Sequence, residues 1–308
     1  MKKILALFFT IVFGSIAFAQ QLPQLTQYMI NNYAVNPAIA GMHDYYQVNT
    51  TIRNQWVGIN DAPRTTILSI YGRKNDNVGF GGLIYNDQVG PTGRLGGSMS
   101  YTYHLNLSST VKAAFALAGG FSQLKISASA LNPEEPDNAV QGDIVRLVPD
   151  ATFGFNTYGK NWYAGLSIPQ LLSFNPNLYD ENFHENFDKE SEGKLVRHYY
   201  IIGAYKHHFD PFWAVEPSVL LKSIGSSTQF DLGVKGMYDD RMWLGAGYRT
   251  GSGDITCLLG YTISERYVFG YSYDLSTDPL STASSGSHEF MLGIKFIKNR
   301  ESDIMKMR

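Results

Sequence analysis

The stretch RLGGSMSYTYHL, residues Arg94 to Leu105, alternates between two kinds of side chain. Its two faces are Leu95, Gly97, Met99, Tyr101, Tyr103 and Leu105 on one side and Gly96, Ser98, Ser100, Thr102 and His104 on the other. A period of two predicts a β-strand with one apolar and one polar face. Strand-like runs of about 8 to 12 residues recur from Tyr45 onward, which is the length that a tilted strand needs to cross a bilayer.

The same alternation marks the C-terminal part of the chain. Tyr267, Phe269, Tyr271 and Tyr273 alternate with Val268, Gly270, Ser272 and Asp274, and Phe290, Leu292, Ile294 and Phe296 alternate with Met291, Gly293, Lys295 and Ile297. The polar faces collect glycine, serine and threonine with an occasional charge, as at Lys235 and Arg249. In a soluble sandwich the apolar faces would pack on each other, whereas in a membrane barrel they would face lipid.

The connections between the strands favour the barrel. About fourteen strands are expected, centred near residues 49, 68, 82, 99, 117, 154, 165, 202, 217, 232, 245, 258, 270 and 292. Short turns at 73–77, 106–109, 158–161, 208–211, 239–241 and 264–266 alternate with longer connections at 54–63, 87–93, 127–149, 169–197 and 275–287, although 224–226 and 250–253 are short. Outer-membrane barrels have short periplasmic turns and longer external loops. We therefore expect an all-β fold, a transmembrane antiparallel β-barrel of outer-membrane type over residues 45–297.

The N-terminus has the features of a signal peptide for export. Lys2 and Lys3 precede an apolar run over residues 4–13, and Ala17-Phe18-Ala19 supplies small residues for cleavage. Residues 1–19 are therefore expected to be removed. Residues 20–44 show weak periodicity and are expected either in the periplasm or in the lumen as a plug, whereas residues 298–308 form a basic periplasmic tail.

Composition narrows the class of protein further. The formal net charge of −2 gives no reason to expect nucleic acid as a partner. Cys257 is the only cysteine, so an intramolecular disulfide is excluded. The 20 tyrosines and 30 glycines suit strands that meet a membrane interface and turn tightly.

No catalytic, cofactor or metal site can be assembled from the sequence. The seven histidines accompany no nucleophile motif, and a lumenal or interfacial role accounts for His104 and His288. No HExxH, paired-cysteine or glycine-rich phosphate motif occurs. The acidic loop 177–193, which includes His184, fits no defined calcium loop, and a hydrated external loop explains it. A protein that is not an enzyme and holds no cofactor or metal is predicted.

Several short motifs, taken together and in order, resemble the PorP/SprF family of type IX secretion membrane proteins. They are Gln27-Tyr28-Met29, Asn36-Pro37-Ala38 with Ala40-Gly41, Arg53-x-Gln55-Trp56-x-Gly58, Ala62-Pro63-x-Thr65, Gly79-x-Gly81-Gly82 with Asp87 and Gly90, Pro149-Asp150, Gly165-Leu166-Ser167 with Gln170-Leu171, Pro217-Ser218 with Leu221-Lys222, Tyr273-Asp274 and Ser287-His288-Glu289. The resemblance covers the chain that follows the predicted signal peptide.

This resemblance implies an outer-membrane barrel that works with the type IX secretion and gliding machinery. It further implies binding, anchoring or export of a surface adhesin through the C-terminal sorting domain of that adhesin, and periplasmic or peptidoglycan-associated secretion components as further partners. The alternative is an outer-membrane pore or a transporter of hydrophobic solutes, because barrels of about fourteen strands also serve that purpose.

The turn over residues 54–63 is the candidate partner-binding surface. If it lies outside the cell, Trp56 could anchor a partner, since aromatic residues and arginine dominate binding hot spots. The residues predicted to bind a partner are Arg53, Gln55, Trp56, Gly58 and Pro63. A structural role is the other interpretation, with Trp56 in an interfacial aromatic girdle or with Arg53 turned inward against a lumenal carboxylate.

Overall fold

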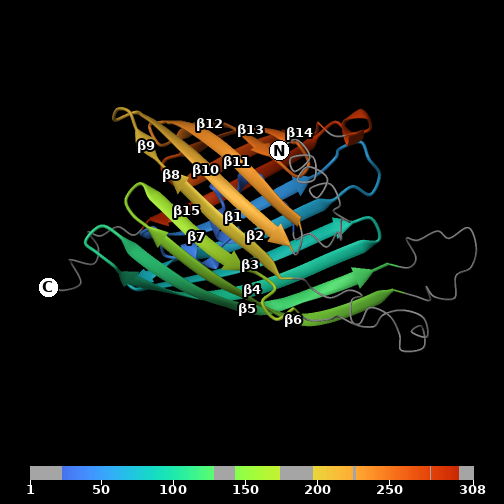
Figure 1. Ribbon diagram of the computed structural model, residues 1–308, viewed down its shortest axis with the longest axis horizontal. Coiled ribbons are helices and arrows are strands. Elements are labelled where there is room, and N and C mark those ends of the chain that lie inside the picture. Colours follow the sequence, from blue (N-terminus) through green and yellow to red (C-terminus); the bar gives the residue numbers. More distant parts are fainter. Residues whose placement is uncertain (1–22, 128–142, 174–196, 225–226, 278, 298–308) are drawn as a thin grey trace, which may run out of the picture.

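The computed structural model describes residues 23–127, 143–173, 197–224, 227–277 and 279–297 as one closed antiparallel β-barrel (Figure 1). Its strands are β1 (Tyr45–Asn54), β2 (Arg64–Asn75), β3 (Val78–Val89), β4 (Thr92–Asn106), β5 (Lys112–Ile126), β6 (Ile144–Tyr158), β7 (Trp162–Ile168), β8 (His198–Tyr205), β9 (His207–His208), β10 (Trp213–Ile224), β11 (Ser227–Tyr238), β12 (Met242–Arg249), β13 (Ile255–Ile263), β14 (Tyr267–Leu275) and β15 (Ser287–Ile297). The prediction of an all-β barrel is confirmed.

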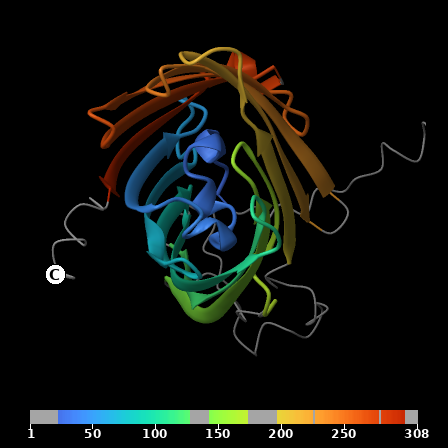
Figure 2. The same cartoon turned by 90° about the vertical axis from the view of Figure 1, so that its left-hand side faces the viewer.

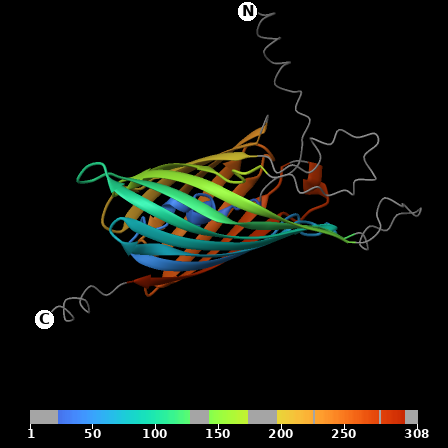
Figure 3. The same ribbon diagram turned by 90° about the horizontal axis from the view of Figure 1, so that it is seen from below.

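The barrel closes because consecutive strands pair in order and the first strand pairs with the last. β1 lies between β2 and β15, and β10 pairs with β11. The two residues of β9 pair with β10, as β8 does, so β8 and β9 form one wall strand and the wall has the expected fourteen. Figure 3 shows these strands tilted against the barrel axis. Every described wall strand therefore pairs on both sides, although β6 pairs with β7 only from Phe153 to Tyr158.

The apolar face of each strand lies on the outside of the barrel. In β4, Met99 is 81% exposed, whereas Thr102 and His104 on the other face are buried. In β14, Phe269 is exposed, whereas Ser272 and Asp274 are buried. Exposed apolar side chains around a closed barrel are the surface that lipid covers. The sequence prediction of lipid-facing and lumen-facing positions is confirmed at these strands.

The two ends of the barrel differ in their connections. The short-turn end carries the connections β2–β3, β4–β5, β6–β7, β11–β12 and β13–β14, and the long-loop end carries the loops before β2, β6, β8 and β15. By the usual rule for such barrels, the long-loop end is external and the short-turn end is periplasmic.

Residues 23–44 lie inside the barrel. Figure 2, which looks along the barrel, shows this segment in the middle of the ring of strands. It contains three short 3-10 helices, η1 (Gln27–Met29), η2 (Asn32–Ala34) and η3 (Pro37–Ile39). Most of its side chains are buried, and Asn36, Ala38 and Ala40 are each 0% exposed. We call residues 23–44 the plug.

Some sequence predictions concern residues that the structure does not describe. The predicted signal peptide (1–19), the acidic loop (177–193) and the basic tail (298–308) lie outside the described residues. Among the described residues, no helix is both long and apolar enough to cross a membrane.

Candidate functional site: the plugged lumen

The plug crosses the lumen from the long-loop end to the short-turn end. Its first described part, around Thr26, contacts Arg53 near the end of β1 and Glu289 near the start of β15, both at the long-loop end. Its last residue, Asp44, directly precedes β1 at the short-turn end. The segment therefore spans the interior that an empty barrel would leave to water.

Polar side chains of the wall bind the backbone of the plug. Ser167 donates a hydrogen bond of 2.6 Å to the Val35 carbonyl, and Thr102 donates one of 3.0 Å to the Pro37 carbonyl. The Nε2 of His104 lies 2.9 Å from the Ala40 carbonyl oxygen. The 3-10 helices of the plug are short, so many of its buried backbone carbonyls need such partners. The small polar face of the strands is thus the complement of the plug.

Glycines in the wall make room for the plug. A β-carbon would come within 2.6 Å of plug atoms at each of Gly79, Gly81, Gly154, Gly165, Gly233 and Gly270. At Gly79 the nearest atom is the Ala40 carbonyl oxygen, 2.1 Å away, which is backbone and cannot turn aside. Glycine allows this close approach of two backbones. The glycines of these lumenal faces therefore allow specific close contacts with the plug.

Two tyrosines anchor the plug sideways. Tyr33 stacks on Tyr71 of β2 with ring centroids 4.6 Å apart, and its hydroxyl lies 2.9 Å from the Ser100 Oγ. Tyr28 lies on the opposite wall, where its hydroxyl donates to the Asp231 carbonyl at 3.1 Å.

A buried ion-pair network holds the plug at the long-loop end. Arg53 lies 2.7 Å from Asp274 Oδ2 and 3.2 Å from Glu289 Oε2, and all three side chains are at most 1% exposed. The strand register places Arg53 directly opposite Glu289. The Arg53 Nη1 also donates to the Thr26 hydroxyl at 2.8 Å. This arginine therefore joins two wall strands to the plug.

Arg249 forms the other half of the network. It lies 3.1 Å from Asp231, 3.2 Å from Asp254 and 3.5 Å from Asp274. Lys222 lies 3.1 Å from the other oxygen of Asp231. We call these side chains, together with Arg53 and Glu289, the lumenal charge network.

The plug completes this network with its backbone. In the network, Arg53, Arg249 and Lys222 face four carboxylates, those of Asp231, Asp254, Asp274 and Glu289. The backbone N–H groups of Thr26 and Gln27 donate to the two oxygens of Glu289 at 2.8 and 3.0 Å. Hydrogen bonds to a buried carboxylate offset much of the cost of its burial. Withdrawal of the plug would remove these two donors from Glu289.

The short-turn end of the lumen is wider and less tightly bound. Arg73 donates to the carbonyls of Gly41 at 2.7 Å and Met42 at 3.0 Å and pairs with Asp44. Beyond the plug lies an open space of about 580 Å³, whose charged lining residues are Lys160, Lys206, Glu216, Lys235, Asp240 and Lys295. Two of these lysines are paired, Lys206 with Asp240 at 2.6 Å and Lys235 with Glu216 at 2.9 Å.

The loop over residues 54–63 lies at the long-loop end and is attached to its neighbours. The backbone N–H of Val57 donates to the Gly286 carbonyl at 2.8 Å, and the N–H of Ser285 donates to the Val57 carbonyl at 2.7 Å. The N–H of Trp56 donates to the Ser287 Oγ at 3.2 Å. Three residues of this loop have positive φ, Trp56 at 46°, Gly58 at 103° and Asp61 at 57°.

The five residues predicted to bind a partner are thus divided between two environments. Arg53 is buried in the lumen, where it contacts Asp274 and Glu289, the inward-turned arrangement that the sequence left open. Pro63 is also buried. Gln55 and Trp56 are half-buried and Gly58 is exposed, so these three of the five residues are accessible, beside the exposed Val57, Asn60 and Asp61 of the same loop. Their contact with a partner stays a prediction.

The described part of the lumen shows no arrangement for metal chemistry. No group of three or more His, Cys, Asp and Glu side chains among the described residues could hold a metal ion. The carboxylates of the charge network are instead interleaved with Arg53 and Arg249. His104 is also engaged, because its Nδ1 lies 2.9 Å from the Tyr158 hydroxyl. The clustered polar residues hold the plug.

The motifs that carry the family resemblance converge on the plug. Asn36, from one of these motifs, caps η3 and donates to the Phe155 carbonyl at 2.9 Å. From other motifs come wall residues that contact the plug: Arg53, Gly79, Gly81, Gly165, Ser167, Ser218, Asp274 and Glu289. Residues scattered over the sequence therefore meet at one structural feature.

Comparisons with known proteins agree with this architecture. The family model described as "Type IX secretion system membrane protein PorP/SprF" matches residues 17–294. The crystal structure of the Ralstonia pickettii toluene transporter TbuX is similar, with a TM-score of 0.51 and 9% identity over 86% of this chain and 92% of that one. A Pseudomonas aeruginosa FadL homologue has a TM-score of 0.48 and 12% identity over 92% of this chain and 96% of that one. At such identities the likeness concerns the fold alone. No curated protein matches this chain.

Proposed function

Because the chain belongs to the PorP/SprF family of type IX secretion system membrane proteins and forms an outer-membrane barrel, we propose that it is a non-enzymatic anchor for a secreted protein. It would bind a surface adhesin through the C-terminal sorting domain and retain or help to export it. The observation that carries this proposal is the plug, which crosses the lumen and is bound to both sides of the wall. A barrel whose lumen is crossed by such a plug suits a scaffold better than an open channel.

The accessible part of the loop 54–63 is the proposed contact surface. Gln55, Trp56 and Gly58 lie at the external end, and the loop is held by backbone hydrogen bonds to residues 285–286. Trp56 has a positive φ, which is uncommon for any residue other than glycine and rare for a bulky side chain. Backbone conformations of this kind concentrate at functional sites. The buried Arg53 supports the base of this loop from the lumen.

The proposal is tested by affinity capture from outer membranes. Tagged protein is solubilised in detergent, and the chains that copurify are identified by mass spectrometry. We expect a large surface protein or secretion components in the wild-type sample and a loss of the surface protein with Trp56→Ala. Trp213→Ala is the matched control, because Trp213 is a 53% exposed tryptophan at the opposite end of the barrel.

Two results would contradict this proposal. If Trp56→Ala lowers only the thermal stability of the barrel and leaves capture intact, Trp56 has a structural role. If the wild-type barrel is recovered alone, in good yield and folded, the anchor function is wrong. The second candidate, a pore or transporter of hydrophobic solutes, would then be tested by conductance in planar bilayers. An apolar cavity beside the plug favours that candidate, whereas the plug opposes it.

A further inference from the structure

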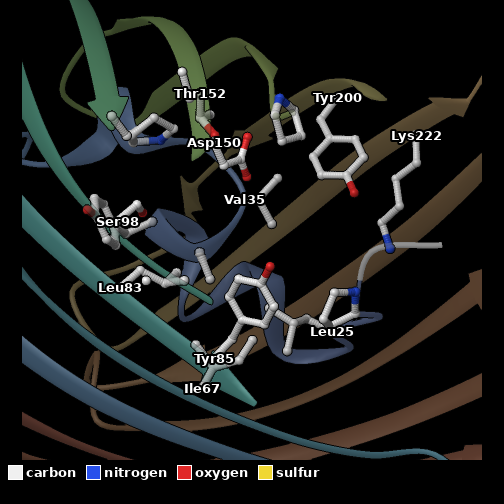
Figure 4. A pocket seen from close by; sticks show the side chains of 18 of the residues that line it. Leu25, Val35, Ile67, Leu83, Tyr85, Ser98, Asp150, Thr152, Tyr200 and Lys222 are labelled. Carbon is white, nitrogen blue, oxygen red and sulfur yellow. The ribbon is translucent and has the colours of Figure 1, made fainter. Parts of the chain in front are cut away.

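A cavity of about 120 Å³ lies between the plug and the wall (Figure 4). Its apolar lining includes Leu25 and Val35 from the plug, Ile67 from β2 and Leu220 from β10. Ile67 and Leu220 are buried. Protein interiors are packed closely and hold few voids larger than a water molecule. A space of this size is larger than an ordinary packing void and could therefore hold a small ligand.

Three polar groups face this apolar space. In Figure 4 the hydroxyls of Tyr85 and Tyr200 and the carboxylate of Asp150 point toward the middle of the cavity. The Tyr85 hydroxyl has a partner, because it lies 3.1 Å from the Ser122 Oγ. Among the described residues, Asp150 forms no ion pair, and its carboxylate accepts a hydrogen bond only from the backbone N–H of Ala151, which leaves acceptor capacity free. The Tyr200 hydroxyl forms no hydrogen bond with a described residue. The cavity thus offers an acceptor, the Asp150 carboxylate, next to an unused hydroxyl.

The cations nearby decide what kind of donor this site would accept. Lys222 lines the cavity, and Arg94 acts electrostatically on Asp150. These two cations disfavour a ligand that is itself a cation. Burial of an ammonium group in apolar surroundings is also costly. A hydroxyl group donates a hydrogen bond without adding charge. A neutral hydroxyl on an apolar body fits this lining best.

The volume sets the size of the apolar body. An engineered apolar cavity of about 150 Å³ is known to stay dry and to bind benzene. The cavity beside the plug is of similar size. We propose that it binds one phenolic ring, with the hydroxyl donating to Asp150 and the ring between Val35, Ile67 and Leu220. The ring belongs either to a free phenol or to a tyrosine side chain of a bound polypeptide. This assignment does not rest on the proposed anchor function.

The test uses the full-length barrel in lipid nanodiscs, with 4-fluorophenol as the probe and ¹⁹F NMR as the readout. Empty nanodiscs correct for partitioning into lipid. Saturable binding is expected, about tenfold tighter than that of fluorobenzene, which lacks the hydroxyl. In Asp150→Leu the ratio of the two affinities is expected to fall to about one, because the acceptor is gone. Asp87→Leu, which removes a lumenal carboxylate outside the cavity lining, should keep the preference for the phenol.

Variants that fill the cavity test the location. Ala118 lines the cavity from β5 and is 2% exposed, so Ala118→Phe should abolish saturable binding. Leu117→Phe is the control, because Leu117 is its neighbour in β5 and is 60% exposed on the lipid side. Val35→Phe fills the space from the plug and replaces Ala118→Phe if that variant does not fold. No saturable binding to the wild type, or equal binding to a folded filled variant, would overturn the proposal.

Competition separates the two sources of the ring. Displacement of 4-fluorophenol by p-cresol alone supports a free phenol as the occupant. Displacement by both p-cresol and a Gly-Tyr-Gly peptide supports a tyrosine side chain. Displacement by neither would contradict a phenol site.

Discussion

The two ends of the plug are held by different kinds of interaction. At the long-loop end, Thr26 and Gln27 meet charged side chains that are almost fully buried, among them Arg53 and Glu289. At the short-turn end, Gly41 and Met42 accept hydrogen bonds from Arg73, whose partner Asp44 is 64% exposed. The first end borders only the smaller apolar cavity of about 120 Å³, whereas the second borders an open space of about 580 Å³.

This difference indicates which end of the plug is bound more weakly to the wall. Breaking one partner of a buried ion pair leaves an uncompensated charge, which costs several kcal/mol, whereas an exposed pair contributes little. We therefore expect the short-turn end to open first and the long-loop end to act as the anchor. Four substitutions test this order, from the largest expected effect to the smallest.

Arg53→Met should destabilise the barrel most. It leaves Asp274 and Glu289 buried without their shared cation, which lowers the free energy of unfolding by about 3–5 kcal/mol. Urea unfolding in lipid vesicles measures this change. Arg53→Lys keeps the positive charge, so its free energy of unfolding should fall clearly less than that of Arg53→Met. Equal losses for the two variants would show that the charge itself matters little.

Gly79→Ala should push the plug away from β3. Its new β-carbon would lie 2.1 Å from the Ala40 carbonyl oxygen, and overpacking of this kind costs about 1–3 kcal/mol. Limited proteolysis should cleave the plug faster in this variant. Gly82→Ala is the matched control in the same strand, because its nearest neighbour would be 3.6 Å away. Similar cleavage rates for both variants would count against a plug seated on Gly79.

Arg73→Ala should loosen only the short-turn end. Loss of the hydrogen bonds to Gly41 and Met42 lowers the free energy of unfolding by about 1–2 kcal/mol. Hydrogen exchange should speed up around residues 40–44 and stay slow around Thr26. Faster exchange at Thr26 of the same size would mean that the two ends are released together.

Lys206→Ala should have the smallest effect. Its ion pair with Asp240 is partly exposed at the short-turn end, and such pairs contribute about 0–1 kcal/mol. The urea midpoint is expected to stay close to that of the wild type. A loss as large as that of Arg53→Met would contradict the distinction between buried and exposed pairs.

The wall of the barrel could be predicted from the sequence because alternate residues of a strand face lipid and lumen and therefore differ in polarity. The faces of β4 and β14 in the structure are those that the alternation predicts. Lumenal positions of Arg249 and Asp274 also follow from this pattern. Their partners do not, because pairing depends on strand register and on contacts between distant parts of the chain.

The position of the plug could not be decided from the sequence. Residues 20–44 show only weak periodicity, so the sequence allowed both the periplasm and the lumen. Its contacts use backbone carbonyls, as at Val35 and Pro37, which carry no signal in the side-chain pattern. Motifs such as Gly79-x-Gly81 did mark the wall side of these contacts, but their meaning required the position of Ala40 and Tyr33.

The most direct test of the account is the position of Tyr33 in intact outer membranes. A photoreactive p-benzoylphenylalanine replaces Tyr33, and mass spectrometry identifies the peptides to which it crosslinks. The structure predicts intramolecular crosslinks to β2, β3 and β4, where Tyr71, Gly81 and Ser100 surround the ring. Crosslinks to a separate periplasmic protein, with none to these strands, would contradict a plug in the lumen.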